Sequence, residues 1–295
     1  MHAPLTRVAA IHDLSGFGRT SLAVVIPVLS SMGIQVCSLP TAVLSSETGA
    51  FDDFVFVDLS HAMPGFLDHW DRLGARFDAV YSGFLGSPAQ VELVARCIAN
   101  NLAPGGLSVV DPVLGDNGVL DPTMTTDMVE RMRWLISRAK CITPNLTEAA
   151  YLLDEPYPDP ERGSMGAAML KDWLFRLSGM GPEMVVITSV PLENTAHNNA
   201  VAAFDRTRGL CWQTACDYIP AFYPGTGDTF ASVLTGSLLQ GDSLPIAIDR
   251  AVQFVTLAIR ATFGHALPAR NGILLERVLQ ALQVPLTAST YTLLE

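Results

Sequence analysis

The sequence is poor in charged residues, and in lysine above all. Asp, Glu, Lys and Arg make up 16% of its 295 residues, and its only lysines are Lys140 and Lys171. So low a charged fraction argues against long disordered tails. Acidic residues outnumber basic ones by 29 to 18, which gives a net charge of −11. A surface this acidic repels nucleic-acid backbones and anionic membranes, so we expect neither as a partner.

Cysteines and long apolar runs are also scarce. The five cysteines are odd in number, scattered, and form no CxxC pair, which predicts reduced thiols packed as small hydrophobes. Apolar runs such as LAVVIPVL at 22–29 are much shorter than a membrane span. The chain does not open with the charged and apolar regions of a secretion signal. We therefore expect a cytoplasmic protein.

Short apolar runs alternate with helical stretches along most of the chain. Nearly continuous apolar strands are typical of a parallel sheet covered by helices on both faces, so the pattern predicts an α/β fold. We find no internal repeat and no domain boundary, and expect one domain over residues 1–295. The expected strands are 7–11, 35–39, 77–84, 107–112, 141–143 and 184–189, and the expected helices are 19–32, 88–101, 123–138, 146–153 and 164–178.

In the C-terminal third of the chain, the alternation of strands and helices gives way to a hairpin followed by helices. Two short apolar strands, 200–204 and 210–214, flank the turn sequence DRTRG and predict a β-hairpin. Helices are expected again at 227–239, 243–262 and 273–282. Near the other end, residues 43–66 read as a long connection, which we expect to cover the substrate or to pack in a dimer.

Polar or glycine-rich segments follow five of the expected strands. In open α/β sheets, ligands bind at the carboxyl ends of the strands, so these segments should meet at one site. They are HDLSGFG (12–18), SGFLGS (82–87), DPVLGDNG (111–118), TPNLTEA (143–149) and TSVP (188–191).

Two common phosphate-binding motifs are absent. A P-loop needs Lys followed by Ser or Thr, but Cys141 follows Lys140 and Asp172 follows Lys171. A dinucleotide fingerprint would need a third glycine after Gly16 and Gly18, where Ser21 stands.

The segment PGTGD (224–228) offers another way to hold phosphate. Residues 225–227 carry little side-chain cover at the start of an apolar helix, and a helix N-terminus with bare amides suits an anion. Asp228 beside it could accept a proton from an attacking hydroxyl. The plainer interpretation is that Thr226 or Asp228 only caps the helix.

Oxygen ligands suited to Mg²⁺ occur in two of the other segments. Asp111 ends a strand and Asp116 follows five residues later, while Asn145 and Glu148 share one face of a helix start. For Asn145 and Glu148 the alternative is an ordinary helix cap.

These motifs together resemble a known family. PGTGD, DPVLGD (111–116) and TPNLTEA are similar to the ribokinase superfamily, while AIHDLSGFGRTSL (10–22), LPTAVLSSETG (39–49) and YSGFLGS (81–87) resemble the pyridoxal and pyridoxamine kinases. The resemblance covers about residues 6–285. It implies a ribokinase-like three-layer α/β/α sandwich with a mostly parallel sheet and an added β-hairpin. It also implies ATP-dependent phosphorylation of the 5′-hydroxymethyl group of a vitamin B6 vitamer, with Mg²⁺, a monovalent cation such as K⁺, and a homodimer.

The resemblance further implies roles for individual residues. Asp228 would be the catalytic base, and Gly225, Thr226 and Gly227 would form the anion hole. Mg²⁺ and the triphosphate would be organised by Asp111, Asp116, Asn145 and Glu148. Thr143 would help to hold the monovalent cation, and Thr188 and Ser189 would contact nucleotide phosphates. The substrate ring would lie near Asp13, Ser15, Val43, Thr48 and Phe84.

Two other functions stay open from the sequence. A hydroxymethylpyrimidine kinase of thiamine synthesis would use the same scaffold on another heterocycle. A non-catalytic B6-binding protein would be a different class, but it would need neither Asp228 nor Glu148.

Overall fold

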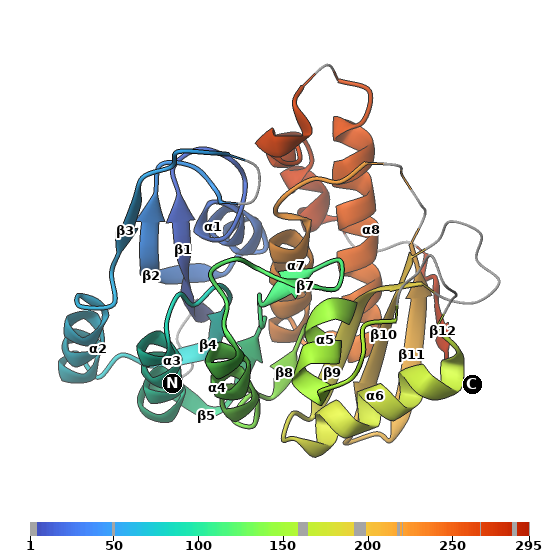
Figure 1. Ribbon diagram of the computed structural model, residues 1–295, viewed down its shortest axis with the longest axis horizontal. Coiled ribbons are helices and arrows are strands. Elements are labelled where there is room, and N and C mark those ends of the chain that lie inside the picture. The colour runs from blue at the N-terminus through green and yellow to red at the C-terminus, as the bar shows by residue number, and fades with distance from the viewer. Residues whose placement is uncertain are drawn as a thin grey trace.

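A ten-stranded sheet runs through the molecule in the order β12-β11-β10-β9-β8-β5-β4-β1-β2-β3 (Figure 1). The structure is a computed structural model that describes residues 5–48, 51–158, 165–191, 199–216, 219, 221–265, 267–284 and 288–294. The parallel part was predicted from the apolar runs and is confirmed. It consists of β1 (Arg7–Ser15), β2 (Gln35–Leu44), β4 (Phe77–Ser82), β5 (Leu102–Val110), β8 (Cys141–Ile142) and β9 (Met184–Pro191).

Helices cover both faces of this sheet and create two cores. Alternate residues of a strand face opposite sides, so Ala9 and Ile11 of β1 join one core while Val8 and Ala10 join the other. The first core is closed by α2 (Met63–Arg72), α3 (Pro88–Asn101), α4 (Thr126–Ile136), α5 (Leu146–Leu153) and α6 (Ala167–Gly179). The second is closed by α1 (Leu22–Ser31), α7 (Thr226–Leu239) and α8 (Leu244–Thr262). The expected three-layer sandwich is therefore confirmed.

Antiparallel strands extend the sheet at both edges. The predicted hairpin is present as β10 (Asn199–Asp205) and β11 (Leu210–Ala215), and the C-terminal strand β12 (Tyr291–Leu293) pairs with β11. At the other edge, β3 (Phe56–Asp58) pairs with β2. Two further short strands, β6 (Gly115–Asp116) and β7 (Val119–Leu120), form a separate hairpin outside the main sheet.

Two expectations about regular structure were wrong. Residues 273–282 form no α-helix but short 3-10 turns at Leu275–Arg277 and Leu279–Gln283, after an earlier one at Ala269–Asn271. Ile273 and Leu275 are both buried, and residues two apart cannot share one face of an α-helix. The stretch 43–66 is not a plain connection either, because it contains β3 and the start of α2; residues 49 and 50 lie outside the described residues.

No helix in the described part of the chain has both the length and the apolar character needed to cross a membrane. The parallel strands β1, β4, β5, β8 and β9 bring the loops at their carboxyl ends to one edge of the sheet, where α7 begins. The topology thus assembles the five polar segments.

Candidate active site

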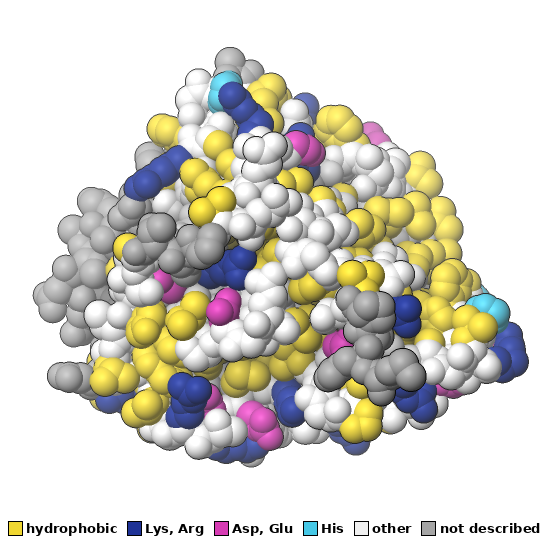
Figure 2. Space-filling view, turned by 180° about the vertical axis from the view of Figure 1, so that it is seen from behind, with side chains coloured by type: hydrophobic (Ala, Val, Ile, Leu, Met, Phe, Trp, Pro, Cys, Tyr) yellow, Lys and Arg dark blue, Asp and Glu magenta, His cyan; other side chains and the backbone are white. Residues whose placement is uncertain are grey.

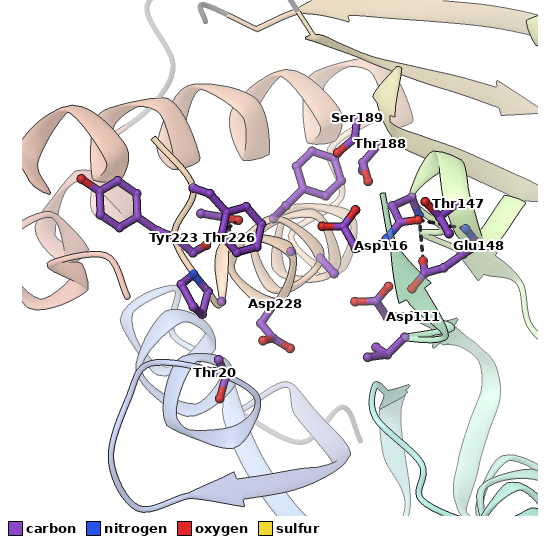
Figure 3. Close-up of a pocket in the computed structure, with 18 of the residues that line it drawn as sticks. Thr20, Asp111, Asp116, Thr147, Glu148, Thr188, Ser189, Tyr223, Thr226 and Asp228 are labelled. Carbon is purple, nitrogen blue, oxygen red and sulfur yellow. Dashed lines mark hydrogen bonds between the residues drawn. The ribbon is translucent and has the colours of Figure 1, made fainter. Parts of the chain in front are cut away.

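A cavity of about 810 Å³ lies at this edge of the sheet. Its walls come from the segments after β1, β5, β8 and β9, from the β6–β7 hairpin and from α7 and α8 (Figure 3). The structure brings nearly all of the predicted site residues to it: Asp13, Ser15, Thr48, Phe84, Asp111, Asp116, Thr143, Asn145, Glu148, Thr188, Ser189, Gly225, Thr226, Gly227 and Asp228.

Val43 is the exception among the predicted residues. It does not line the cavity; its side chain is 38% exposed, and its strand partner is Val57 of β3. Successive side chains of a strand point to opposite sides, and the next residue, Leu44, is the one that lines the cavity. Leu44 therefore lies in the cavity wall where Val43 was expected, and the contact of this strand with a substrate ring stays a prediction.

The N-terminus of α7 carries no side-chain cap. Gly225 precedes the helix in the left-handed conformation, with φ 81° and ψ 3°, and no side chain of the described residues accepts a hydrogen bond from the first turn. The hydroxyl of Thr226 instead donates to the carbonyl of Tyr223 over 3.1 Å. The plainer interpretation, a capping role for Thr226 or Asp228, is thus wrong, and the first amides of α7 are left for a ligand.

The two glycines of this turn serve different purposes. A Cβ atom at Gly225 would overlap the backbone oxygen of Arg19, so the close approach of the two chain segments requires glycine there. A Cβ atom at Gly227 would have no atom within 4 Å. The helix end is therefore held tightly on one side and open on the other.

Asp228 lies in the first turn of α7 and points into the cavity (Figure 3). Its Oδ2 accepts a hydrogen bond of 2.9 Å from the backbone amide of Ser21. Burial raises its pKa from 3.8 to about 7, the Ser21 amide opposes the rise, and the charge of Asp13 adds to it. A carboxyl group with a pKa near neutrality can accept a proton at physiological pH.

Asp111 and Glu148 form a second acidic region facing Asp228. Burial raises the pKa of Asp111 well above its ordinary value, and the charges of Glu148 and Asp228 raise it further. Burial also raises the pKa of Glu148 to about 7. The hydroxyl of Thr143, only 4% exposed as a residue, meets no hydrogen-bond geometry with the described residues, but it lies close enough to Asp111 to oppose the rise in the pKa of that carboxyl group.

Glu148 also has a structural role. It forms a capping box with Asn145. The backbone amide of Asn145 donates to Glu148 Oε2 over 2.8 Å, and the backbone amide of Glu148 donates to Asn145 Oδ1 over 2.9 Å. Its Oε1 accepts from the amide of Leu114 over 2.9 Å. The alternative interpretation of Asn145 and Glu148 as a helix cap is therefore confirmed, and both residues also line the cavity.

The charged side chains that line the cavity are all acidic among the described residues. Among its described lining residues none is Lys, Arg or His, whereas seven are acidic: Asp13, Glu47, Asp111, Asp116, Asp121, Glu148 and Asp228. Burial raises the pKa of Asp111 and of Asp228, and buried carboxylates close to one another favour the binding of metal ions. The described residues contain no ready cluster of three His, Cys, Asp or Glu ligands, so a cation here would need oxygens from substrate or water.

Sequence reasoning missed part of the lining. Glu47 lies within the segment LPTAVLSSETG (39–49), for which the sequence predicts no role of this residue, yet it lines the cavity near Asp13. Val252, Val255 and Ile259 of α8 line an apolar stretch together with Phe222. Their helical spacing is the same as that of core residues, so no signal in the sequence distinguished them.

Comparison with known proteins agrees with this geometry. A family model described as phosphomethylpyrimidine kinase matches residues 26–272. A pyridoxine/pyridoxal/pyridoxamine kinase of Bordetella bronchiseptica is 30% identical over 269 residues, covering 86% of this chain and 89% of the relative.

Two solved structures are also similar. A Bacteroides thetaiotaomicron protein, provisionally described as a phosphomethylpyrimidine kinase and crystallised with pyridoxal, shares 52% identity and a TM-score of 0.91, covering 98% of this chain and 99% of that one. The pyridoxal kinase of Lactobacillus plantarum shares 34% identity and a TM-score of 0.83, covering 95% and 97%. The chain therefore belongs to the phosphomethylpyrimidine kinase family of ribokinase-like proteins, and it is an ATP-dependent phosphotransferase.

Proposed function

We propose that this kinase transfers the γ-phosphoryl group of ATP to the 5′-hydroxymethyl group of a vitamin B6 vitamer and so supplies pyridoxal 5′-phosphate by salvage. The observation that carries the proposal is the uncapped N-terminus of α7 with the buried carboxylate of Asp228 in its first turn. The pyridoxal bound to the similar Bacteroides protein supports the choice of substrate.

The chain's own groups suffice for positioning and proton transfer. The amides of residues 225–227 would hold the transferring phosphoryl group, because a helix N-terminus combines free donors with partial positive charge. Asp228 would accept the proton of the attacking hydroxyl. The Ser21 amide, bonded to one of its oxygens, would keep the carboxylate in place while it does so.

Mg²⁺ fits the acidic wall opposite Asp228. Asp111 would supply a buried carboxylate, and the buried hydroxyl of Thr143 beside it would supply a further oxygen for Mg²⁺ or for a monovalent cation such as K⁺. When bound, Mg²⁺ neutralises part of the triphosphate charge, which no basic side chain among the described lining residues can do. Asp116, Asn145, Thr188 and Ser189 would face the phosphates, and Glu148 would hold this wall together.

The two substrates would occupy opposite ends of the cavity. The vitamin ring would lie near Asp13, Ser15, Leu44, Thr48 and Phe84, and the adenine would lie against the apolar stretch of α8. Asp228 would then lie between the ring and the phosphates.

The decisive experiment is ADP production with magnesium-ATP against pyridoxal, pyridoxamine, pyridoxine and hydroxymethylpyrimidine. We expect turnover with at least one B6 vitamer and a much lower kcat/KM with the pyrimidine. A higher kcat/KM for hydroxymethylpyrimidine than for every B6 vitamer would favour a hydroxymethylpyrimidine kinase, an activity compatible with the family description. Vitamin binding without ADP release would indicate a non-catalytic B6-binding protein.

We also propose that the protein is a homodimer that pairs through the β3 edge. All three residues of β3 are exposed, with Phe56 43% and Val57 50% exposed, and Val55 just before them is 63% exposed. Apolar side chains gather on the side of the molecule that carries β1–β3, at the right of Figure 2. An apolar sheet edge is a ready site for pairing with another copy. Sedimentation of the wild type and of Val57→Lys tests this, because the charge should yield monomers.

A further inference from the structure

The β6–β7 hairpin places Asp116 in the cavity wall, but its own backbone hydrogen bonds are too few to fix its position. Each of its strands has two residues, and it belongs to no larger sheet. Its two-residue turn, Asn117–Gly118, has φ of 51° and 78°, the tight geometry that asparagine and glycine favour. An isolated two-stranded hairpin is marginal in water, so contacts from elsewhere must fix this one.

Helix α5 supplies these contacts along one face. At the base of the hairpin, Asn145 Nδ2 donates to the carbonyl of Gly115 over 2.8 Å. At the tip, the amide of Gly118 donates to Thr147 Oγ1 over 2.9 Å, and the hydroxyl of Tyr151 donates to the carbonyl of Gly118 over 3.4 Å. Both polar groups of the Gly118 backbone are thus bonded to α5.

The tip is also confined by packing. A Cβ atom at Gly118 would lie 2.6 Å from the ring of Tyr157, so the turn lies directly against that ring. Thr147 is only 2% exposed, and its side chain reaches the cavity wall beside Glu148 (Figure 3). The hairpin therefore has one well-defined position, set by α5 on one side and by Tyr157 on the other.

We propose that Thr147 is a positioning residue for nucleotide binding, acting through the Gly118 amide on the hairpin that presents Asp116. Tyr151 assists from the same helix. The inference rests on the proposed function, because it takes the hairpin as a wall of the nucleotide site. Without the Thr147 hydroxyl, the hairpin occupies its binding-competent position only part of the time, and the apparent nucleotide affinity falls by that fraction.

The test compares Thr147→Val, which keeps the shape and removes the hydroxyl, with Thr147→Ser, which keeps the hydroxyl. For Thr147→Val we expect the dissociation constant of magnesium-ADP, measured by calorimetry, and the KM for ATP to rise roughly tenfold, equivalent to about 1.4 kcal/mol. The KM for the vitamin should stay unchanged, and Thr147→Ser should restore most of the nucleotide affinity. Hydrogen exchange of the segment 114–120 should speed up in the valine variant alone.

Thr126→Val, on the exposed start of α4, is the control for an ordinary threonine change. If Thr147→Val does not fold, Tyr151→Phe removes the other bond between α5 and Gly118 and should weaken ADP binding in the same direction by a smaller factor. Unchanged ADP affinity in a folded Thr147→Val, or equal rises in both KM values, would overturn the positioning role alone. A wild type that binds no ADP would overturn the proposed function, and the positioning role with it.

Discussion

The backbone amide of Ser21, just before α1, bonds Oδ2 of Asp228 in the first turn of α7 over 2.9 Å. The two residues are 207 positions apart, and Ser21 adopts a φ of 51°, which a non-glycine residue rarely takes. This contact holds one oxygen of a carboxylate that lines the cavity. It links the segment after β1 directly to the uncapped N-terminus of α7.

Replacing Asp228 by Asn should remove the base and keep the shape. We expect Asp228→Asn to fold, to bind ATP, and to turn over at least about a hundredfold more slowly, because a positioned base typically contributes roughly 10²–10⁴ in rate. Single-turnover ADP formation measures the effect. Turnover close to that of the wild type would exclude Asp228 as the base.

The activity should depend on pH through the same group. The pKa of Asp228 is raised to about 7, so the base is increasingly protonated and inactive as the pH falls below that value. We expect kcat/KM for the vitamin to fall about tenfold per pH unit on the acid side. A pH–rate profile that stays flat between pH 5 and 8 would contradict this.

The stability of the ligand-free protein should show the opposite trend. The pKa of Asp228 is higher in the folded state than its ordinary 3.8, so between these values the folded state binds more protons than the unfolded state. Its contribution to stability is therefore fully present below about pH 4 and is lost as the pH rises toward 7. Thermal unfolding at pH 5.5 and 7.5 should show a smaller drop in Tm for Asp228→Asn than for the wild type.

Gly225, just before α7, and Gly227, in its first turn, should respond differently to replacement by alanine. Gly225→Ala must place a side chain at φ 81° against the Arg19 backbone, so we expect a loss of at least about 1–2 kcal/mol of stability together with loss of ATP binding. Gly227→Ala meets open space and should fold normally, which makes it the matched control. Urea unfolding separates the two, and equal stabilities would refute the tight-approach argument.

Removing the Asp111 carboxylate, a proposed Mg²⁺ ligand, should increase the Mg²⁺ concentration that the reaction requires. For Asp111→Asn we expect the Mg²⁺ concentration at half-maximal rate to rise at least roughly tenfold, since even outer-shell changes at metal sites cost that much. Asp127→Asn, on α4 and outside the cavity, is the control. EDTA should abolish the wild-type activity, and excess Mg²⁺ should restore it.

Thr290, just before the C-terminal strand β12, should add measurably to stability. Thr290 donates through its hydroxyl to Asp249 Oδ1 over 2.6 Å, and its amide donates to the same carboxylate. Asp249 is fully buried on α8, so Thr290→Val should cost about 1 kcal/mol. Ser289→Ala, on the neighbouring exposed residue, should have no effect in urea unfolding.

The sequence alone determined the parallel sheet, the hairpin at 200–214 and most of the site. Nearly continuous apolar strands can be buried only between two layers of helices, and parallel strands bring their carboxyl ends together, so Asp111 and Thr143 could be placed at one edge before any contact was known. Asp228 follows no parallel strand, and only the family resemblance placed it at the same site. The turn at Gly225–Gly227 stood out in the sequence because two glycines in three positions cost backbone entropy, but whether a side chain capped the helix stayed open.

Tertiary structure decided everything that depends on distant contacts. Which of Val43 and Leu44 faces the cavity follows from the register of β2, and the apolar spacing of α8 is the same for core packing as for a ligand wall. Gly225 beside Arg19, Asp228 beside Ser21 and Thr147 beside Gly118 join segments far apart in the chain. Local propensity and periodicity carry no information on such pairs, because they arise only when separate elements pack against one another.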